Sequence, residues 1–266
     1  MKKSKEILLQ ELRMIPIKTS REIKIMREAG KKLFLIMGCL LKKTASGVKL
    51  SEIEELALVL IKKAGGVPNF NKVSSYKWAT CINVNNGVVH GVPDNYKIKP
   101  GDLISIDVGM LFKGYNADIA RTVLVPKSDQ RDPQMGKFLS GGEKALKEAV
   151  QAAKPGNRIG HISEAIEKSL KASGLKPIES FVGHGIGKDL HEEPQIPGFL
   201  RESAKTTNLI KSGMVFCIEV IYVKKNLQVR LAEDGWTVET EDGGIAGLFE
   251  DMIAITPEGP LVLTKA

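Results

Sequence analysis

The chain has 266 residues, of which 42% are hydrophobic and 26% charged, and its formal net charge is +8. This composition excludes an intrinsically disordered chain, and the length suits one large domain or two small ones. The longest apolar run, residues 33–41, is shorter than the roughly 20 residues of a membrane span, and residues 7–9 are too few for a signal-peptide core. Three cysteines without a CxxC motif indicate a reducing compartment, so we expect a cytoplasmic protein without a membrane partner.

The positive charge is concentrated at the N-terminus. Residues 1–32 hold ten Lys or Arg and four Glu, which leaves only +2 for the rest of the chain. A basic arm can attract polyanions such as RNA. The alternative is a solubilising end, because no aromatic residues lie between the charges as a base-stacking surface requires. We predict a basic extension over residues 1–14 and a single domain over residues 15–266.

Two helices are predicted in the first part of the chain. Thr19 and Glu22 have the spacing of a capping box, and apolar residues then recur on one helical face as far as Leu40. Ser51 and Glu54 repeat that spacing and predict a second helix, which ends at a Gly-Gly pair.

Strands and a second helix pair follow. Residues 103–108 and 215–220 are rich in strand-forming residues, whereas 142–153 and 163–172 read as helices. Residues 126–135 contain Ser, Asp, Gln and two prolines and are predicted to be a connector. The order of helix pair, strands, helix pair, strands indicates an α+β protein.

The two halves of the chain also share sequence letters. Three matching pairs lie 112 positions apart: 50–52 with 162–164, 99–101 with 211–213, and Asp107 with Glu219. We infer a duplicated helix-pair-plus-sheet unit with pseudo-repeats at about 19–126 and 140–263, related by an approximate two-fold axis. A site at the join would collect equivalent residues from both halves; the alternative is a chance similarity.

Two aspartates flank a predicted hairpin turn. Asp107 and Asp118 are eleven residues apart, with Lys113-Gly114 between them. Pairing about that turn makes them cross-strand or diagonal neighbours, roughly 5–8 Å apart. Two carboxylates so placed repel each other and need a cation, unless one or both turn outward to solvent.

Two further acids favour the cation. Glu219 occupies the repeat-equivalent place of Asp107, and Glu250 is embedded in another apolar run. Four carboxylates of this kind predict a divalent metal centre. Oxygen ligands together with an imidazole suit manganese, iron, cobalt or zinc.

Candidate imidazoles lie in turn-like segments. His184 lies within a Gly-His-Gly-Ile-Gly stretch, while His90 and His191 lie close to glycine or proline. A hydrogen-bonded structural role is the alternative for any single histidine. His161 stands apart, on the approach to the fourth predicted helix, and is expected at the surface.

These residues carry a family likeness. The succession of His90, Asp107, Asp118, His184, His191, Glu219 and Glu250 resembles methionine aminopeptidases of the type I bacterial class, which have the pita-bread fold. The likeness extends from about residue 15 to residue 263. Its most specific stretches are Cys81–Asn85, Val89–Asp94, Gly183–Gly187, Leu190–Gln195 and Asp234–Thr237.

The resemblance implies a central dinuclear site that holds two divalent ions, Co²⁺, Mn²⁺, Fe²⁺ or Zn²⁺. Asp107 would chelate one ion, Asp118 and Glu250 would bridge both, and His184 and Glu219 would complete the other. A hydroxide bridging the two ions would attack the first peptide bond. Glu219 would relay a proton to the departing amine. His191 would hydrogen-bond the scissile group. His90, the third catalytic candidate, would contact the substrate near the attacked bond and is a candidate acid.

The resemblance also implies an apolar pocket for the methionine side chain. Tyr76, Cys81 and Trp236 resemble its walls. Leu190 stands where an aromatic residue is usual, and Phe70 stands where a small or thiol residue is common; ordinary core packing is the alternative for both. Two departures, Val220 for a usual proline and Asn116-Ala117 for a usual His-Gly, remove no ligand.

The implied function is removal of the initiator methionine from nascent chains with a small second residue. Nascent N-termini are the expected partners, and the basic N-terminus suggests docking on the ribosome; we expect a monomer and no DNA partner. One alternative is an Xaa-Pro peptidase, a class with a sizeable domain before the metal-binding half, whereas the first helix here starts near Thr19. Another is a binding protein of the same fold, a class that generally lacks metal ligands.

Overall fold

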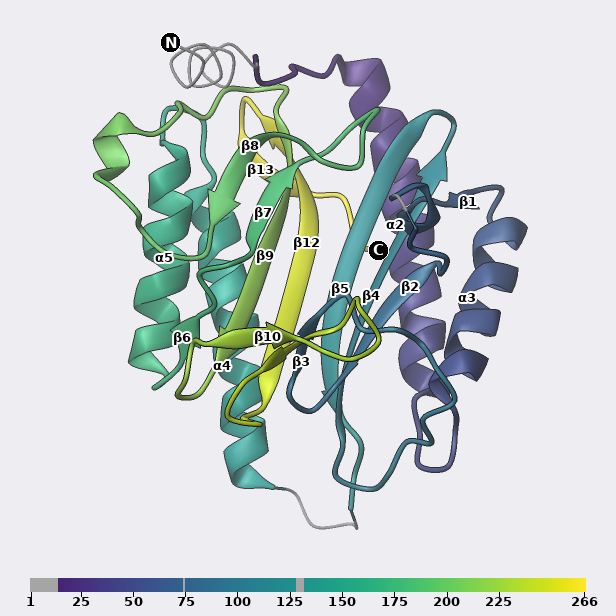
Figure 1. Cartoon of the computed structure of the whole chain (residues 1–266). Helices are drawn as coiled ribbons and strands as arrows, with labels where there is room; N and C mark the ends of the chain where they lie inside the picture. The colour runs from purple at the N-terminus through teal and green to yellow at the C-terminus, as the bar shows by residue number, and fades with distance from the viewer. Residues whose placement is uncertain (1–13, 74, 128–131) are drawn as a thin grey trace, which may run out of the picture.

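The computed structural model describes residues 14–73, 75–127 and 132–266, so most of the predicted basic extension lies outside the described residues. The described part contains four α-helices: α2 Ser20–Lys43, α3 Leu50–Lys63, α4 Pro133–Ala152 and α5 Ile159–Ala172. They lie on one side of a ten-stranded antiparallel sheet (Figure 1). None of these helices has both the length and the apolar character that crossing a membrane requires.

Helix α2 begins as predicted. The Thr19 hydroxyl accepts a hydrogen bond from the Glu22 amide at 3.3 Å, and the Glu22 carboxylate accepts one from the Thr19 amide at 2.7 Å. This reciprocal capping satisfies two amides that the helix itself leaves unpaired. The apolar face then buries Met26, Leu33 and Leu40 completely. The capping-box prediction for this helix is confirmed.

Helix α3 exists as predicted, but its predicted cap is wrong. The N-cap is Lys49, and the Glu52 carboxylate accepts the Lys49 amide at 3.0 Å. Glu54 instead points into the protein and accepts the amides of Ala79 and Thr80 at 2.7 and 3.0 Å. Glu54 is buried and acts as an acceptor for these donors, and the sequence spacing could not distinguish this role from that of a cap.

The second helix pair begins earlier than predicted. Helix α4 starts at Pro133 because the Asp132 carboxylate accepts the amides of Gln134 and Met135. Pro at the first helical position and Asp before it are start signals, which the connector prediction for 126–135 missed. Helix α5 likewise starts at Ile159, before the predicted position 163.

The predicted hairpin is confirmed. Strands β4 (Leu103–Phe112) and β5 (Tyr115–Leu124) pair antiparallel around Lys113 and Gly114. Both turn residues have positive φ, 49° and 84°, as the tight hairpin turn that matches strand twist requires. Gly109 is opposite Asp118, and Asp107 is opposite Ala120, so the two aspartates are diagonal neighbours on one face.

The second half builds a corresponding pair of strands. In β9 (Val215–Val223) and β12 (Ala246–Thr256), Glu219 is directly opposite Glu250. The halves join where β12 pairs with β5, with Glu250 opposite Ala120. The remaining strands are β1 (Val67–Pro68), β2 (Thr80–Val84), β3 (Gly87–Val89), β6 (Lys176–Pro177), β7 (Val182–Gly185), β8 (Glu192–Pro197), β10 (Val229–Leu231), β11 (Val238–Thr240) and β13 (Gly259–Val262). A small sheet of β10, β11 and β3 lies in front of the main sheet (Figure 1).

The two halves match at one spacing in the strands and at another in the helices. Gly101 and Gly213, 112 positions apart, have φ of 91° and 90°, and each lies two residues before the start of its strand, β4 or β9. Lys49 and Arg158, which are the N-caps of α3 and α5, are only 109 positions apart. The match of residues 50–52 with 162–164 is therefore wrong as a structural equivalence, since a three-residue difference separates the helices from the strands.

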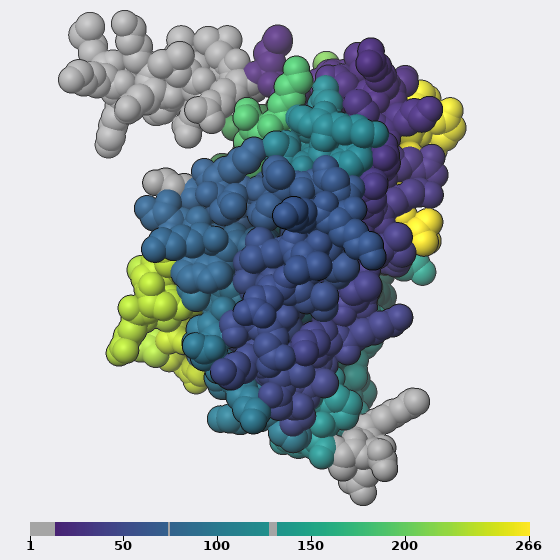
Figure 2. Space-filling view, turned by 90° about the vertical axis from the view of Figure 1, so that its right-hand side faces the viewer, coloured from purple at the N-terminus to yellow at the C-terminus, as the bar shows by residue number. Residues whose placement is uncertain are grey.

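Alternation along the strands separates a covered face from an open one. Ile104, Ile106 and Val108 of β4 pack in one apolar cluster with α2 and α3, whose outer surface is seen in Figure 2. Phe216 and Ile218 of β9 pack in a second cluster with α4 and α5. Because successive strand residues point to opposite faces, Asp107 and Glu219 must point away from the helices.

Candidate metal centre

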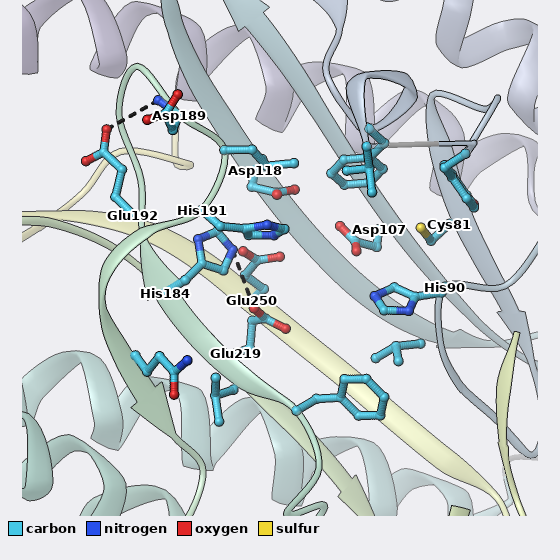
Figure 3. A pocket seen from close by; sticks show the side chains of 18 of the residues that line it. Cys81, His90, Asp107, Asp118, His184, Asp189, His191, Glu192, Glu219 and Glu250 are labelled. Atoms are coloured by element: carbon cyan, nitrogen blue, oxygen red, sulfur yellow. Dashed lines mark hydrogen bonds and ion pairs between the residues drawn. The ribbon is translucent and has the colours of Figure 1, made fainter. Parts of the chain in front are cut away.

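A cavity of about 820 Å³ lies on the sheet face opposite the helices. Figure 3 shows Asp107, Asp118, Glu219 and Glu250 converging with the three labelled histidines in front of the strands, with the helices behind them. All of the site residues predicted from the sequence line this cavity: Phe70, Tyr76, Cys81, His90, Asp107, Asp118, His184, Leu190, His191, Glu219, Trp236 and Glu250. The histidine set aside, His161, lies in α5, where its Nδ1 accepts the Arg158 amide at 2.9 Å.

Three carboxylates form the first group of donors. Oxygens of Asp107, Asp118 and Glu250 all lie within 4.8 Å of one another. Asp107 Oδ1 and Glu250 Oε1 are buried, and neither has a hydrogen-bond partner among the described residues. Buried carboxylate oxygens without donors are costly, so their convergence indicates a place for a cation.

Glu250 also belongs to a second group of donors, together with His184 and Cys217. The His184 Nε2 atom lies 3.6 Å from Glu219 Oε1, and its Nδ1 lies 2.8 Å from the Gly185 carbonyl. Nδ1 must carry the proton to donate to that carbonyl, which leaves the Nε2 lone pair directed at the acids. A second interaction that fixes the tautomer in this way is typical of metal-ligating histidines.

The acids are strongly perturbed by their surroundings. Desolvation raises the pKa of Asp107 to about 7. Burial, followed by the charges of Glu250, Asp107 and Glu219, raises the pKa of Asp118 well above its ordinary value. Desolvation, followed by the charge of neighbouring acids, also raises the pKa values of Glu219 and Glu250. The four carboxylates cannot all be ionised near neutral pH unless positive charge is added.

The histidines shift in the opposite direction. Burial lowers the pKa of His184 to about 3 and also lowers the pKa values of His90 and His191. The rings are therefore neutral at physiological pH, which is the form that ligates a metal or exchanges hydrogen bonds with a substrate. Carboxylate oxygens with neutral imidazole suit divalent transition metals, so the residues present fit such ions.

Two histidines border the acids without joining either donor group. The ring of His191 packs edge-on against His184 with centroids 4.5 Å apart. His90 has a φ of 60°, which is uncommon for a residue with a side chain, and its ring packs edge-on against Phe181. Backbone strain of this kind is often found at functional sites.

The predicted pocket residues form one apolar cluster beside the acids. Phe70, Tyr76 and Cys81 are buried together, and the cluster also includes Trp78, Leu190 and Trp236. The Tyr76 ring packs edge-on against both tryptophans, each at 5.1 Å, and its hydroxyl donates to the Thr80 carbonyl at 2.8 Å. The pocket therefore offers an aromatic and thiol surface in which the Tyr76 hydroxyl is already hydrogen-bonded.

Sequence reasoning missed two residues of the site. The Cys217 sulfur lies within 4.8 Å of ligand atoms of His184 and Glu250. Cys217 precedes Glu219 by two residues in β9, so strand alternation could have placed it on the same face. Phe181 lines the cavity beside His90 but comes from a segment with no periodic signal.

Comparisons with known proteins agree with this geometry. The sequence matches the model of metallopeptidase family M24 over residues 24–257. It is 38% identical over 252 residues to methionine aminopeptidase 1 of Bacillus subtilis (strain 168), covering 95% of this chain and 100% of that protein. The crystal structure of methionine aminopeptidase from Thermotoga maritima is similar with a TM-score of 0.90 and 36% identity, covering 95% of this chain and 100% of that one.

A prolidase is also similar. The structure of the prolidase from Pyrococcus furiosus has a TM-score of 0.73 at 25% identity, and the match covers 97% of this chain but 67% of the prolidase. The similarity to the Thermotoga protein is thus both closer and more complete. Together these structures confirm the predicted pita-bread, α+β architecture.

Proposed function

Because the chain belongs to metallopeptidase family M24, we propose that it removes the N-terminal methionine from peptides and nascent proteins in a metal-dependent reaction. The observation that carries the proposal is the convergence of four strand carboxylates and His184 beside an apolar pocket in one cavity. The similarity in sequence and structure to methionine aminopeptidases, over nearly the whole chain, favours this reaction over that of a prolidase.

The donor set supports two divalent ions. Asp107 would hold one ion, His184 and Glu219 the other, and Asp118 and Glu250 would contact both. The group of Asp107, Asp118 and Glu250 and the group of His184, Cys217 and Glu250 share Glu250, which supports two ions side by side. When bound, such ions polarise a carbonyl and lower the pKa of coordinated water, so that hydroxide is available near neutral pH. Co²⁺, Mn²⁺, Fe²⁺ and Zn²⁺ all suit these ligands.

The other polar residues would act on the scissile bond. His191, next to His184 at the cavity surface, would donate a hydrogen bond to the scissile group as negative charge develops there. His90 would contact the substrate from the opposite wall. Glu219, which lies beside His184, would pass a proton to the departing amine.

The apolar cluster would bind the methionine side chain. Cys81 and the Tyr76 ring offer the polarisable and aromatic contacts that suit a flexible thioether. Trp236 and Leu190 would complete the walls, and Phe70 would limit the depth of the pocket. The apolar walls would disfavour Lys or Arg as the first residue of the substrate.

A peptide panel tests the proposal. With added Mn²⁺ or Co²⁺, the protein should cleave Met-Ala-Ser, and kcat/KM for Met-Lys-Ser should be at least about 100-fold lower, because a long second side chain is sterically excluded. Ala-Ala-Ser, which lacks the methionine, and the metal-free protein are the controls. Equal turnover of both methionine peptides, or preference for an Xaa-Pro peptide, would refute the substrate assignment.

The cellular setting is also a proposal. We place the protein in the cytoplasm, docked near nascent chains by the positive charge of residues 1–32. Co-sedimentation with ribosomes should then be strong at low salt and weaken as salt increases, because phosphate contacts release counterions. Deletion of residues 1–13 should reduce it. Binding that is unchanged by the deletion would show that the basic segment is not the contact.

A further inference from the structure

A buried ion pair lies beside the cavity and is not explained by the metal centre. The Lys18 ammonium and the Glu192 carboxylate are 2.5 Å apart, and their side chains are only 5% and 9% exposed. Removing two charges from water carries a large desolvation cost, which a buried pair offsets only with good geometry. The close contact between Lys18 and Glu192 meets this condition.

The pair connects the N-terminal segment to the loop that carries His191. Lys18 lies just before α2, where its amide donates to the Gly213 carbonyl at 2.7 Å, and Pro16 nearby lines the cavity. Glu192 is the first residue of β8 and follows His191 directly. Figure 3 shows Glu192 and Asp189 on the side of His191 away from the acids.

The loop, residues 186–191, is shaped around this pair. The Asp189 amide donates to Glu192 Oε1 at 3.3 Å. A Cβ atom at Gly187 would lie 2.5 Å from Glu192 Oε1 and 2.7 Å from Lys18 Cε, so a side chain at this position would displace the pair. Glycine is therefore required for the loop and the ion pair to pack together.

A second contact holds the loop from the side of the metal centre. The Asn116 side chain donates to the carbonyls of Gly187 and Lys188 at 3.1 and 2.9 Å. Asn116 precedes Asp118 by two residues on β5, so one side of the loop is tied to a strand that carries a metal-ligand candidate. Lys18 and Glu192 fasten its other side.

We infer that Lys18 and Glu192 are positioning residues, which hold the 186–191 loop so that His191 faces the scissile bond. This inference rests on the proposed function. Without Lys18, the Glu192 carboxylate would be buried and unpaired, and moving toward water would carry His191 with it. A displacement of about 1 Å at a reacting group can lower a rate by about 10²-fold.

A double-mutant cycle tests the positioning role. Lys18→Met should lower kcat for Met-Ala-Ser by roughly 10- to 100-fold. In a His191→Ala background, the same substitution should change kcat less than about twofold, because the group it positions is already absent. An equal decrease in both backgrounds, or no decrease in the wild-type background, would overturn the inference. Lys43→Met breaks the exposed Lys43–Glu52 pair and should leave kcat unchanged.

Hydrogen exchange provides a readout that does not need turnover. In Lys18→Met, amides of the 186–191 loop should exchange at least about tenfold faster, while those of β9 and β12 stay protected. Unchanged loop exchange in Lys18→Met would overturn the inference, whether or not the wild-type protein is active. If the wild-type protein is inactive but the loop exchanges faster in Lys18→Met, only the proposed function is refuted. If Lys18→Met does not fold, Glu192→Gln, which removes the charge but keeps the acceptor for Asp189, takes its place with the same expected results.

Discussion

Asp118→Asn should lower kcat/KM for Met-Ala-Ser by about 10³-fold or more, which corresponds to about 4 kcal/mol of transition-state stabilisation. Asp118 is 4% exposed and lies in the three-carboxylate group with Asp107 and Glu250. An amide of nearly the same size keeps the packing but removes a negative oxygen donor. Titration calorimetry with Mn²⁺ should show that at least one ion is lost or bound much more weakly.

The same substitution should stabilise the metal-free protein. The pKa of Asp118 is raised well above its ordinary value, so the folded protein takes up a proton there that the unfolded chain does not. That uptake costs free energy near neutral pH, and asparagine has no such cost. We therefore expect a higher melting temperature than wild type without metal, and a lower one with saturating Mn²⁺.

The control for this pair of effects is Glu28→Gln. Glu28 is an exposed acid that pairs with Lys113 on the outer surface, so its neutralisation removes equal charge without touching the cavity. It should change neither metal affinity nor kcat/KM. A wild-type rate in Asp118→Asn, or a metal-free protein less stable than wild type, would contradict the assignment of Asp118 to the metal centre.

The metal-free protein should lose stability as the pH rises from about 6.5 to 9. Histidine has an ordinary pKa of 6.5 and cysteine one of 9.0. Below the first value the histidines also affect the stability, and above the second the cysteines do. Asp118, Glu219 and Glu250 have pKa values raised well above ordinary, and the pKa of Asp107 is raised to about 7. In this range the folded state binds more protons than the unfolded state, so the free energy of unfolding falls with increasing pH.

The histidines act in the opposite direction at lower pH. The folded-state pKa of His184 is lowered to about 3, so between that value and 6.5 the unfolded chain binds the extra proton and stability rises with pH. The two effects oppose each other below 6.5, and the acids dominate above it. The free energy of unfolding of the metal-free protein should therefore depend less steeply on pH below 6.5 than between pH 6.5 and 9.

Thermal unfolding across this range, with chelator and with excess Mn²⁺, measures the effect. Bound ions compete with protons for the carboxylates, so metal should abolish the loss at high pH and add about 3 kcal/mol at a free concentration 100 times Kd. A metal-free melting temperature that rises between pH 6.5 and 9 would mean that the four acids are not buried together.

Much of the fold could be predicted from local patterns in the sequence. Thr19 and Glu22 act on each other within one helical turn, and Lys113-Gly114 determines its own turn conformation, so both could be predicted from short-range chemistry. The alternation in β4 and β9 likewise determined that Asp107 and Glu219 lie on the face opposite their apolar neighbours. The acids of the site were therefore visible as charges inside apolar strands.

The roles of residues that depend on partners far away in the sequence could not be predicted from local patterns. Glu54 has the spacing of a cap but bonds to residues 79 and 80, and Cys217 becomes a neighbour of His184 only through strand pairing. The burial of Lys18 depends on Glu192, which is 174 positions away along the chain. The sequence by itself determined which donors are present and the strand faces on which they lie. The tertiary structure alone decided which of them meet, because burial and electrostatic interaction depend on separation in space and not along the chain.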